Sequence, residues 1–420
     1  MNNSRFALFN FPFRLFFLLT GLYGVVTVGA WMSYLFGGLA LPLGWSSVHW
    51  HAHEMLFGLT SAAIAGFLLT AMCNWTGAPP LRGSALLGLA CLWLAGRVMM
   101  WTASWWPAGW VAVVDLLFLP WMAIYVARVL LAHGNKRNLI MVAILLLLTL
   151  ANGMMHAGFM TGSGFWLTLG QLTAFNLITL MMVVIGGRII PLFTINWLRN
   201  NGGDIAAVAP SARLDRVTLI TTALLVPADW LIGFPWITGF LAAVAGVLHG
   251  ARLATWGGWK TGREPLLWIL HLGYVWIVVA LLLKGAAAFN LVAASVWQHA
   301  LGVGAMGTLI LGIMTRVALG HTGRSLGLPA PSFIAWAVCL FELAAGVLVV
   351  IGFCTRAAAI MLAAFSIAAG FVGHYGQGGG DATLALVHSQ ALMKDVAISG
   401  GFLALAVAGA GAWSVDAWRR

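Results

Sequence analysis

Charged residues are scarce in this chain. Asp, Glu, Lys and Arg together make up 7% of its 420 residues, whereas ordinary globular domains carry about 25%. Hydrophobic residues reach 62% and the mean hydropathy is +0.97. Because a soluble fold needs a largely polar surface, this composition excludes a soluble domain as the main body of the protein.

Acidic residues are rarer still, with 10 Asp and Glu against 21 Lys and Arg and a net charge of +11. An excess of basic residues is also typical of nucleic-acid-binding proteins, which gather Lys and Arg on one face. Here the basic residues lie between long apolar runs. We therefore expect no nucleic acid partner.

Cysteine is also sparse, and none of the four cysteines forms a CxxC or CxxCH motif. This spacing argues against a disulfide framework and against covalently attached haem c. No cleavable signal peptide is evident, because the first apolar run is too long for a signal sequence and has no small-residue cleavage site. We expect that run to be the first membrane span.

Apolar runs of about 18 residues or more recur along the whole length, each long enough to cross a bilayer as a helix. They are too long for the strands of a membrane β-barrel. The sequence therefore predicts an all-α, polytopic transmembrane helix bundle with 12 or 13 spans. The expected spans are 13–37, 51–73, 84–103, 108–132, 138–160, 163–188, 214–232, 234–254, 265–284, 288–317, 332–352, 355–374 and 384–410.

The basic residues predict the orientation of these spans. Through the tenth span almost all Lys and Arg fall on one side, together with the polar loop at 196–216, and only Arg97 and Lys284 fall on the other. The positive-inside rule then places the N-terminus in the cytoplasm. Thirteen spans would leave Arg419 and Arg420 outside, against the same rule, so the choice between 12 and 13 stays open.

Histidines carry most of the candidate chemistry, because ionisable residues inside a membrane are costly and mark functional sites. Three of them, His49, His51 and His53, stand in the segment WSSVHWHAHEM at 45–55 at the outer mouth of the second span. Neutral imidazole is the usual ligand of haem iron and copper, and helix bundles place such sites between facing helices. A lone buried histidine is more often a packing residue, but three so close need a common reason. The candidate metal ligands are His49, His51, His53, His156 and His299.

The second and third histidines of this segment, His51 and His53, pose a geometric question. Residues two apart diverge by about 200° on a regular helix, so His51 and His53 cannot ligate one metal from the same face. Either His51 belongs to a loop and points inward beside His53, or each serves a different centre.

His156 follows Asn152 by four positions, which places both residues on one helical face. We interpret His133 and His249 as solvated residues beside cytoplasmic loops, and find no obvious partner for His374 and His388.

Several long segments form a recognisable pattern: FRLFF at 13–17, WHAHEM at 50–55, GFLLTAMCNWTGAPPLRG at 66–83, GGRIIPLFT at 186–194 and TRVALGHTGR at 315–324. Together they resemble the NnrS family of bacterial inner-membrane proteins. The likeness covers about residues 5–330 and implies a protein of nitric oxide metabolism that contains haem, of b type, and copper. The cofactor-binding residues it implies are His51, His53, His156, His271, His299, His321, Arg188 and Arg316, without assigning ligands to metals.

The C-terminal part departs from that pattern. ELAAGVLVVIGFCTRAAAIMLA from residue 342 and MKDVAISGG from residue 393 resemble the DoxX family of small four-helix membrane proteins. The expected domains are therefore a ten-span NnrS-like bundle at 1–330, which binds haem and copper, and a three-span DoxX-like segment at 331–420.

The resulting expectation is a multi-pass protein of the bacterial inner membrane that binds nitric oxide and removes or reduces it, with an electron donor of unknown identity. Glu54 is the candidate proton relay, and Asp115 and Asp229 are weaker ones. Nitric oxide is small and apolar, so it can arrive through the surrounding lipid. Two alternatives remain open: a non-catalytic nitric oxide sensor or metal-handling protein, and a transporter, against which the sparse intramembrane charge argues.

Overall fold

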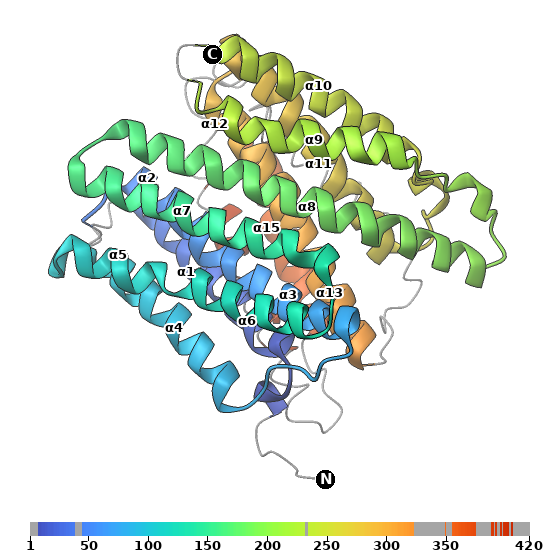
Figure 1. Cartoon of the computed structure of the whole chain (residues 1–420), viewed down its shortest axis with the longest axis horizontal. Coiled ribbons are helices and arrows are strands. Elements are labelled where there is room, and N and C mark those ends of the chain that lie inside the picture. The colour runs from blue at the N-terminus through green and yellow to red at the C-terminus, as the bar shows by residue number, and fades with distance from the viewer. Residues whose placement is uncertain are drawn as a thin grey trace. The chain divides into compact units, whose positions relative to one another are not determined.

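A computed structural model describes residues 7–37, 44–231, 234–322 and 355–374, together with isolated residues between 349 and 405. Every regular element in these residues is a helix (Figure 1), which confirms the all-α fold class. The α-helices are α1 (Pro12–Gly37), α2 (Ser47–His53), α3 (Thr60–Thr76), α4 (Ser84–Trp101), α5 (Ala108–Leu116), α6 (Phe118–Ala132), α7 (Leu139–Thr161), α8 (Gly164–Asn200), α9 (Ala212–Ala228), α10 (Pro235–Ala254), α11 (Pro265–Ala288), α12 (Ala294–His299), α13 (Thr308–Thr322) and α15 (Thr355–His374). Two π-helical segments, η2 (Glu54–Leu59) and η7 (Ala300–Gly307), join α2 to α3 and α12 to α13.

Nine helical segments of the described residues are long and apolar enough to cross a membrane. They confirm a polytopic bundle, and their bounds are Pro12–Tyr34, Ser47–Thr76, Ser84–Trp101, Ala108–Ala132, Lys136–Thr161, Gly164–Asn200, Pro235–Ala254, Pro265–Ala288 and Ala294–Ala318. The span expected at 214–232 corresponds to α9, which has 17 residues and is not among the nine. The spans expected near 332–352 and 384–410 fall largely outside the described residues.

The sixth span, expected at 163–188, extends further in the structure. Proline at 191 does not end the helix at 188: α8 continues to Asn200 with Pro191 inside it. A proline removes one backbone hydrogen bond, and membrane helices tolerate this because neighbouring groups satisfy the freed carbonyls. With 37 residues, α8 is about 55 Å long and exceeds a ~30 Å hydrocarbon core.

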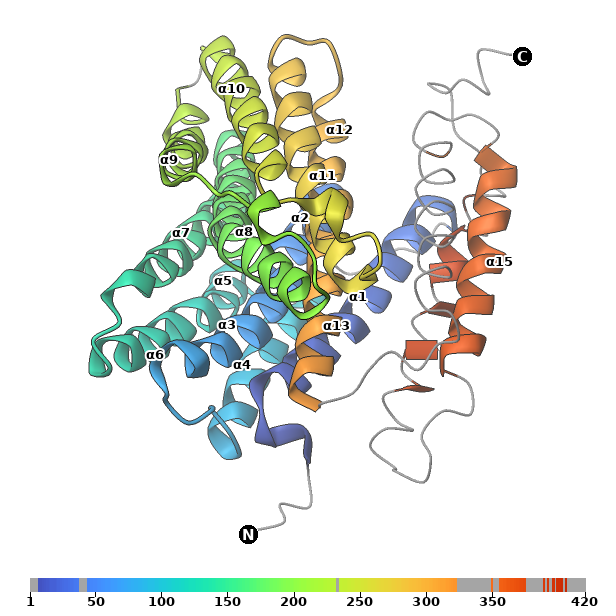
Figure 2. The same ribbon diagram turned by 90° about the vertical axis from the view of Figure 1, so that its right-hand side faces the viewer.

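The chain divides into two compact units. The main unit comprises residues 9–16 and 43–325, and the tail unit comprises 17–42 and 326–420, together with the first eight residues. In the main unit α7 packs along α8, and α10 packs between α9 and α11 (Figure 2). The domain boundary expected at residue 330 remains a prediction.

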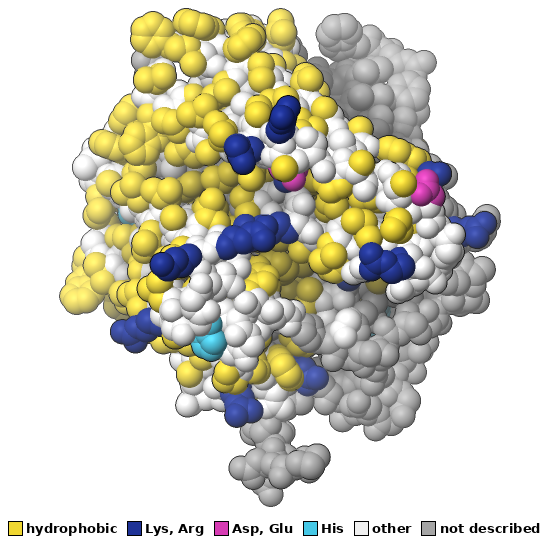
Figure 3. All heavy atoms as spheres, turned by 45° about the vertical axis from the view of Figure 1, so that its right-hand side comes forward, with side chains coloured by type: hydrophobic (Ala, Val, Ile, Leu, Met, Phe, Trp, Pro, Cys, Tyr) yellow, Lys and Arg dark blue, Asp and Glu magenta, His cyan; other side chains and the backbone are white. Residues whose placement is uncertain are grey.

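The outer surface of the main unit is strongly apolar. On the face drawn in Figure 3, hydrophobic side chains cover much of the described surface, and most of the charged side chains that are visible are Lys and Arg. Large apolar residues of the spans are widely exposed, with Val303 at 71% and Phe240 at 66%. Such a surface is costly in water but suits lipid. The polar chemistry lies inside the bundle.

Candidate functional site

A π-helical turn positions the first candidate residues. In the second span the helix widens over η2, directly after His53, and His53 and Glu54 have no exposed surface. The Thr60 hydroxyl donates to the Met55 carbonyl five residues earlier at 2.7 Å, and the Thr60 backbone N–H reaches the same oxygen. Segments of this kind insert one residue into a helix and are frequent at functional sites. Here the π turn sets the direction of the histidine relative to the rest of the span.

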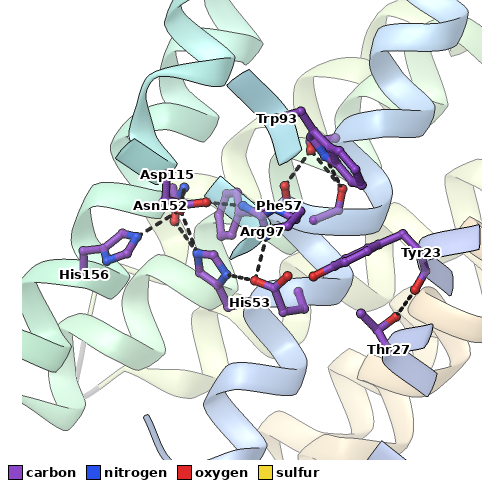
Figure 4. Close-up of polar contacts among 12 residues, drawn as sticks. Tyr23, Thr27, His53, Phe57, Trp93, Arg97, Asp115, Asn152 and His156 are labelled. Atoms are coloured by element: carbon purple, nitrogen blue, oxygen red, sulfur yellow. Dashed lines mark hydrogen bonds and ion pairs between the residues drawn. The ribbon is translucent and has the colours of Figure 1, made fainter. Parts of the chain in front are cut away.

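The His53 ring lies at the centre of a buried polar cluster (Figure 4). Its Nδ1 atom is 2.8 Å from Oε1 of Glu54, and its Nε2 atom is 2.8 Å from Oδ1 of Asn152 and 3.1 Å from Oδ2 of Asp115. The four residues come from α2, η2, α5 and α7. Three transmembrane segments therefore meet at one imidazole.

A buried arginine joins the two carboxylates. Nη1 of Arg97 donates to Oε1 of Glu54 at 2.7 Å, and Nη2 contacts Oδ1 of Asp115 closely (Figure 4). Arg97 is on α4, and the adjacent Gly96 makes room for this contact. A Cβ atom at Gly96 would lie 3.1 Å from Oδ1 of Asp115. α5 can therefore approach α4 closely enough to form the ion pair.

The second oxygen of Asp115 collects the remaining donors. Oδ2 accepts from Nδ2 of Asn152 at 2.7 Å and lies 3.0 Å from Nε2 of His156. Asn152 and His156 are one turn apart on α7, as their spacing predicts. This carboxylate therefore contacts Arg97, Asn152 and both imidazoles.

The charges of the cluster do not balance without one more positive charge. Arg97 contributes one positive charge, and Glu54 and Asp115 contribute two negative ones when ionised. Both ring nitrogens of His53 face acceptor oxygens, yet a neutral imidazole has only one N–H. One proton or one metal cation in the cluster resolves both mismatches.

The donor atoms present fit a metal ion. His53, Asp115 and His156 are all buried, and one ligand atom from each lies within 4.8 Å of the other two. Two imidazoles and a carboxylate form a donor set that suits copper, iron and zinc. The Trp45 ring lies 5.2 Å from both imidazole rings and stacks on Phe159 at 5.0 Å, which shields the cluster from water.

His51 lies two residues before His53 but interacts with a histidine of a different helix. His51 is within α2, so the alternative in which it belongs to a preceding loop is wrong. It lies within electrostatic range of His299, the last residue of α12 before the second π segment. Nδ1 of His299 donates to the carbonyl of Ser295 at 2.8 Å, which leaves Nε2 as the ligand nitrogen, an arrangement common among metal-bound histidines.

The alternative in which His51 and His53 serve different centres stays a prediction. The start of α3 approaches η7, since the hydroxyl of Thr60 lies 3.9 Å from the sulfur of Met306. Metal binding at the His53–Asp115–His156 cluster, or at His51 and His299, remains a prediction.

Three other histidines predicted to bind metal or cofactor occupy different surroundings. His49 Nδ1 lies 2.7 Å from Oγ of Ser46, the N-cap residue of α2. His271 Nε2 lies 3.0 Å from the Thr194 hydroxyl, and its buried Nδ1 has no hydrogen-bond partner among the residues that the structure describes. His321 lies in the last turn of α13, and its side chain is outside the described part of the structure.

The two predicted arginines have local partners. Nη1 of Arg188 donates to Oδ1 of Asn138 at 2.5 Å. The guanidinium of Arg316 lies 4.1 Å from the centre of the Phe193 ring. Their role as anchors for haem propionates remains a prediction.

Sequence reasoning missed Arg97 and misjudged His249. In the sequence, Arg97 falls on the side of the membrane where Lys and Arg are almost absent. That unusual position was the available signal that it has a special role. His249 is not solvated: it is fully buried, with Nδ1 2.7 Å from the Tyr274 hydroxyl and Nε2 2.8 Å from the Thr222 hydroxyl. α10 turns this side chain towards α9 and α11 and away from the nearby loop.

Fold and site define a multi-pass helical membrane protein with a buried His–Asp–His cluster between its spans. The chain belongs to the NnrS family, whose model, described as NnrS protein, matches residues 7–377. The match runs past residue 330, where the resemblance was expected to end.

Two curated proteins of Escherichia coli strain K12 match part of the chain. Inner membrane protein YqjF is 38% identical over 86 residues, which is 20% of this chain and 62% of that protein. Inner membrane protein YphA is 37% identical over 93 residues, 22% of this chain and 65% of that protein. The chain thus spans less than two thirds of the length of either relative. No solved structure matches. Together with the nine apolar helical segments found in the described part of the chain, these relatives support a multi-pass inner-membrane location. The resemblance of residues 340–416 to DoxX proteins remains a prediction.

Proposed function

We propose that this NnrS protein binds nitric oxide at a copper- and haem-containing centre within the inner membrane, and removes or reduces it under nitrosative stress or during denitrification. Family membership supports the link to nitric oxide. The observation that carries the proposal is the convergence of His53, Asp115 and His156 in the buried interior.

Copper is proposed at the His53–Asp115–His156 cluster. The donor set is suitable, and the net charge of Arg97, Glu54 and Asp115 favours one added positive charge. A Cu(I) ion would supply that charge without the proton that the cluster otherwise needs.

Haem is proposed at the neighbouring pair, His51 and His299. The hydrogen bond from His299 to Ser295 leaves Nε2 available as a ligand. When bound, copper and haem would supply the sites at which nitric oxide binds. An electron donor of unknown identity would complete any reduction, and the lipid around the bundle would provide the route of entry.

The protein's own residues would exclude water and manage protons. Trp45 and Phe57 pack against the His53 ring, at 5.2 Å each between ring centres. Glu54 contacts both His53 and Arg97, which places a carboxylate beside the metal ligands. Glu54 is therefore the proposed proton relay.

The second candidate function is non-catalytic nitric oxide sensing or metal handling. It is favoured by the fact that each ligand nitrogen of the cluster already contacts an oxygen at hydrogen-bond distance. Such a cluster is stable with a proton in place of a metal, so a metal could enter and leave without unfolding the bundle.

The metal assignment is tested on the full chain purified in detergent, by metal analysis and by the visible spectrum of haem. We expect His53→Ala and His156→Ala to lower bound copper at least tenfold while haem and membrane yield stay near normal, because each variant removes one of three ligands. His133→Ala is the matched control, since His133 is exposed and its Nδ1 only bonds the Val129 carbonyl. Unchanged copper in both cluster variants would show that the cluster is structural.

Catalysis is tested separately with an electrode that follows nitric oxide. Consumption by the purified wild-type protein with a chemical reductant, lost in His53→Ala and kept in His133→Ala, supports an enzyme. Binding of nitric oxide without consumption supports the sensor or metal-handling alternative. Protein that purifies without a haem spectrum and without copper contradicts both.

A further inference from the structure

Two histidines of the tail unit, for which the sequence indicated no partner, contact each other. Nδ1 of His374 lies 3.0 Å from Nδ1 of His388, and the ring centres are 5.3 Å apart. His374 is the last residue of α15, and His388 follows 14 residues later. The pair lies in the C-terminal segment, separate in sequence from the proposed copper and haem ligands.

A carboxylate lies close to one histidine of the pair, on the side away from the other histidine. Oδ2 of Asp395 lies 3.9 Å from Nε2 of His374, on the ring edge opposite to His388, and its side chain is only 13% exposed. Gly370 lies one turn before His374 on the same face of α15. A Cβ atom there would lie 2.9 Å from Cβ of Asp395, so a residue without a side chain makes room for the aspartate.

This order of groups is typical of a metal site. Metal-bound histidines commonly orient their second nitrogen towards a carboxylate, which fixes the ring and raises its basicity.

The distance between the two nitrogens also permits a shared ion. Nitrogens 3.0 Å apart can each bind one ion at about 2.0 Å, with an angle of about 95° between the two bonds. Without an ion, the same contact needs one ring to donate its Nδ1 proton to the other, because two lone pairs at this distance repel.

We infer that His374 and His388, oriented by Asp395, form a binding site for a first-row divalent metal ion of the zinc type in the tail unit. Two imidazoles near a carboxylate suit zinc and copper(II) better than magnesium or calcium, which prefer oxygen ligands. Solvent or a further side chain would complete the coordination. The site is independent of the proposed nitric oxide chemistry.

The experiment counts zinc on the full chain in detergent, after chelation and reloading with zinc chloride. Wild-type protein should bind one zinc ion more than the variant carrying both His374→Gln and His388→Gln. Asp395→Asn should weaken that binding ten- to hundredfold. His53→Ala should leave this zinc ion in place, which separates the result from the fate of the main-unit cluster.

A rescue variant distinguishes a metal site from a hydrogen-bonded pair. Cysteine is a good zinc ligand, so His388→Cys should keep the zinc ion that His388→Gln loses. If the pair is only hydrogen-bonded, glutamine preserves a donor and an acceptor. In the presence of chelator, the His388→Gln variant should then have a higher melting temperature than the His388→Cys variant. Equal zinc content in wild-type protein and the double glutamine variant would overturn the inference.

Discussion

Arg97 shows how much a single buried residue determines in this bundle. It bridges Glu54 and Asp115, and all three side chains are 0–5% exposed. In an apolar interior, ionised groups persist only when they are paired and hydrogen-bonded. The arginine therefore holds η2, α4 and α5 in register around His53.

We expect Arg97→Gln to destabilise the protein by about 3–5 kcal/mol, because it leaves two carboxylates in an apolar interior without their cation. Thermal unfolding of the purified protein in detergent measures this loss. Adding Glu54→Gln to the Arg97 variant should restore part of the stability, since it removes one of the unpaired charges.

Arg128→Gln is the matched control, because Arg128 is exposed on α6. It should change stability by less than about 0.5 kcal/mol. A comparable loss in both arginine variants would show that the buried ion pairs do not hold the bundle together.

The two basic residues that break the charge asymmetry of the sequence have a common explanation. Arg97 pairs with Asp115, and Lys284 donates to Oδ2 of Asp229 at 2.6 Å and to Oδ1 of Asn176 at 2.8 Å. Both cations lie inside the protein and do not contact lipid headgroups, so the positive-inside rule does not apply to them. The sequence marked these residues as exceptions, but only the fold supplies their partners.

At the level of elements, hydropathy predicted most spans within a few residues, because a helix in lipid must be long and apolar along its whole length. It could not predict the π segments. The residues of Glu54–Leu59 and Ala300–Gly307 are as apolar as their neighbours, with Glu54 as the one exception. A π turn changes hydrogen-bond spacing and leaves the hydrophobic pattern almost unchanged.

The same limit explains the partial prediction of the site. His53, His156 and Glu54 stood out because ionisable residues in membranes are rare. Their common partner, Asp115, lies on a helix that is otherwise apolar, and the distance of 62 residues from His53 hides the contact from any local pattern. The direction of each histidine depends on the π turn and could not be deduced from regular helix geometry.

Deleting Met55 from η2 tests the role of this element. The deletion removes the extra residue that widens this turn, so α2 should shift relative to α3. His53 would then lose its contacts with Asp115 and Asn152, so bound copper should fall at least tenfold while the protein still inserts in the membrane. The measurement is metal analysis of the purified variant.

A deletion of equal length provides the control. Asn201 lies in the exposed turn after α8, and its removal should leave copper unchanged. Normal copper in the Met55 deletion would mean that the π turn does not orient the cluster.

For the whole molecule, the open question is which side of the membrane each loop faces. Nine described helices have the length and apolarity of spans, but length and apolarity carry no direction. The direction comes from the basic residues, which the positive-inside rule assigns to the cytoplasm. The loop at 196–216 carries Arg199, Arg213 and Arg216, so it should face the cytoplasm together with the N-terminus.

Cysteine labelling in intact cells tests this orientation. In a background without Cys73, Cys91, Cys339 and Cys354, a cysteine at Asn201 should resist a membrane-impermeant thiol reagent until the membrane is opened. A cysteine at Thr161, exposed at the end of α7 one span earlier, should react from outside, because consecutive loops alternate between the two sides. Labelling of Asn201→Cys and protection of Thr161→Cys in intact cells would show that the topology is the reverse of the predicted one. The proposed ligands His51 and His53, near the start of the second span, and His299, at the end of α12, would then face the cytoplasm. Electrons would have to be delivered from that side.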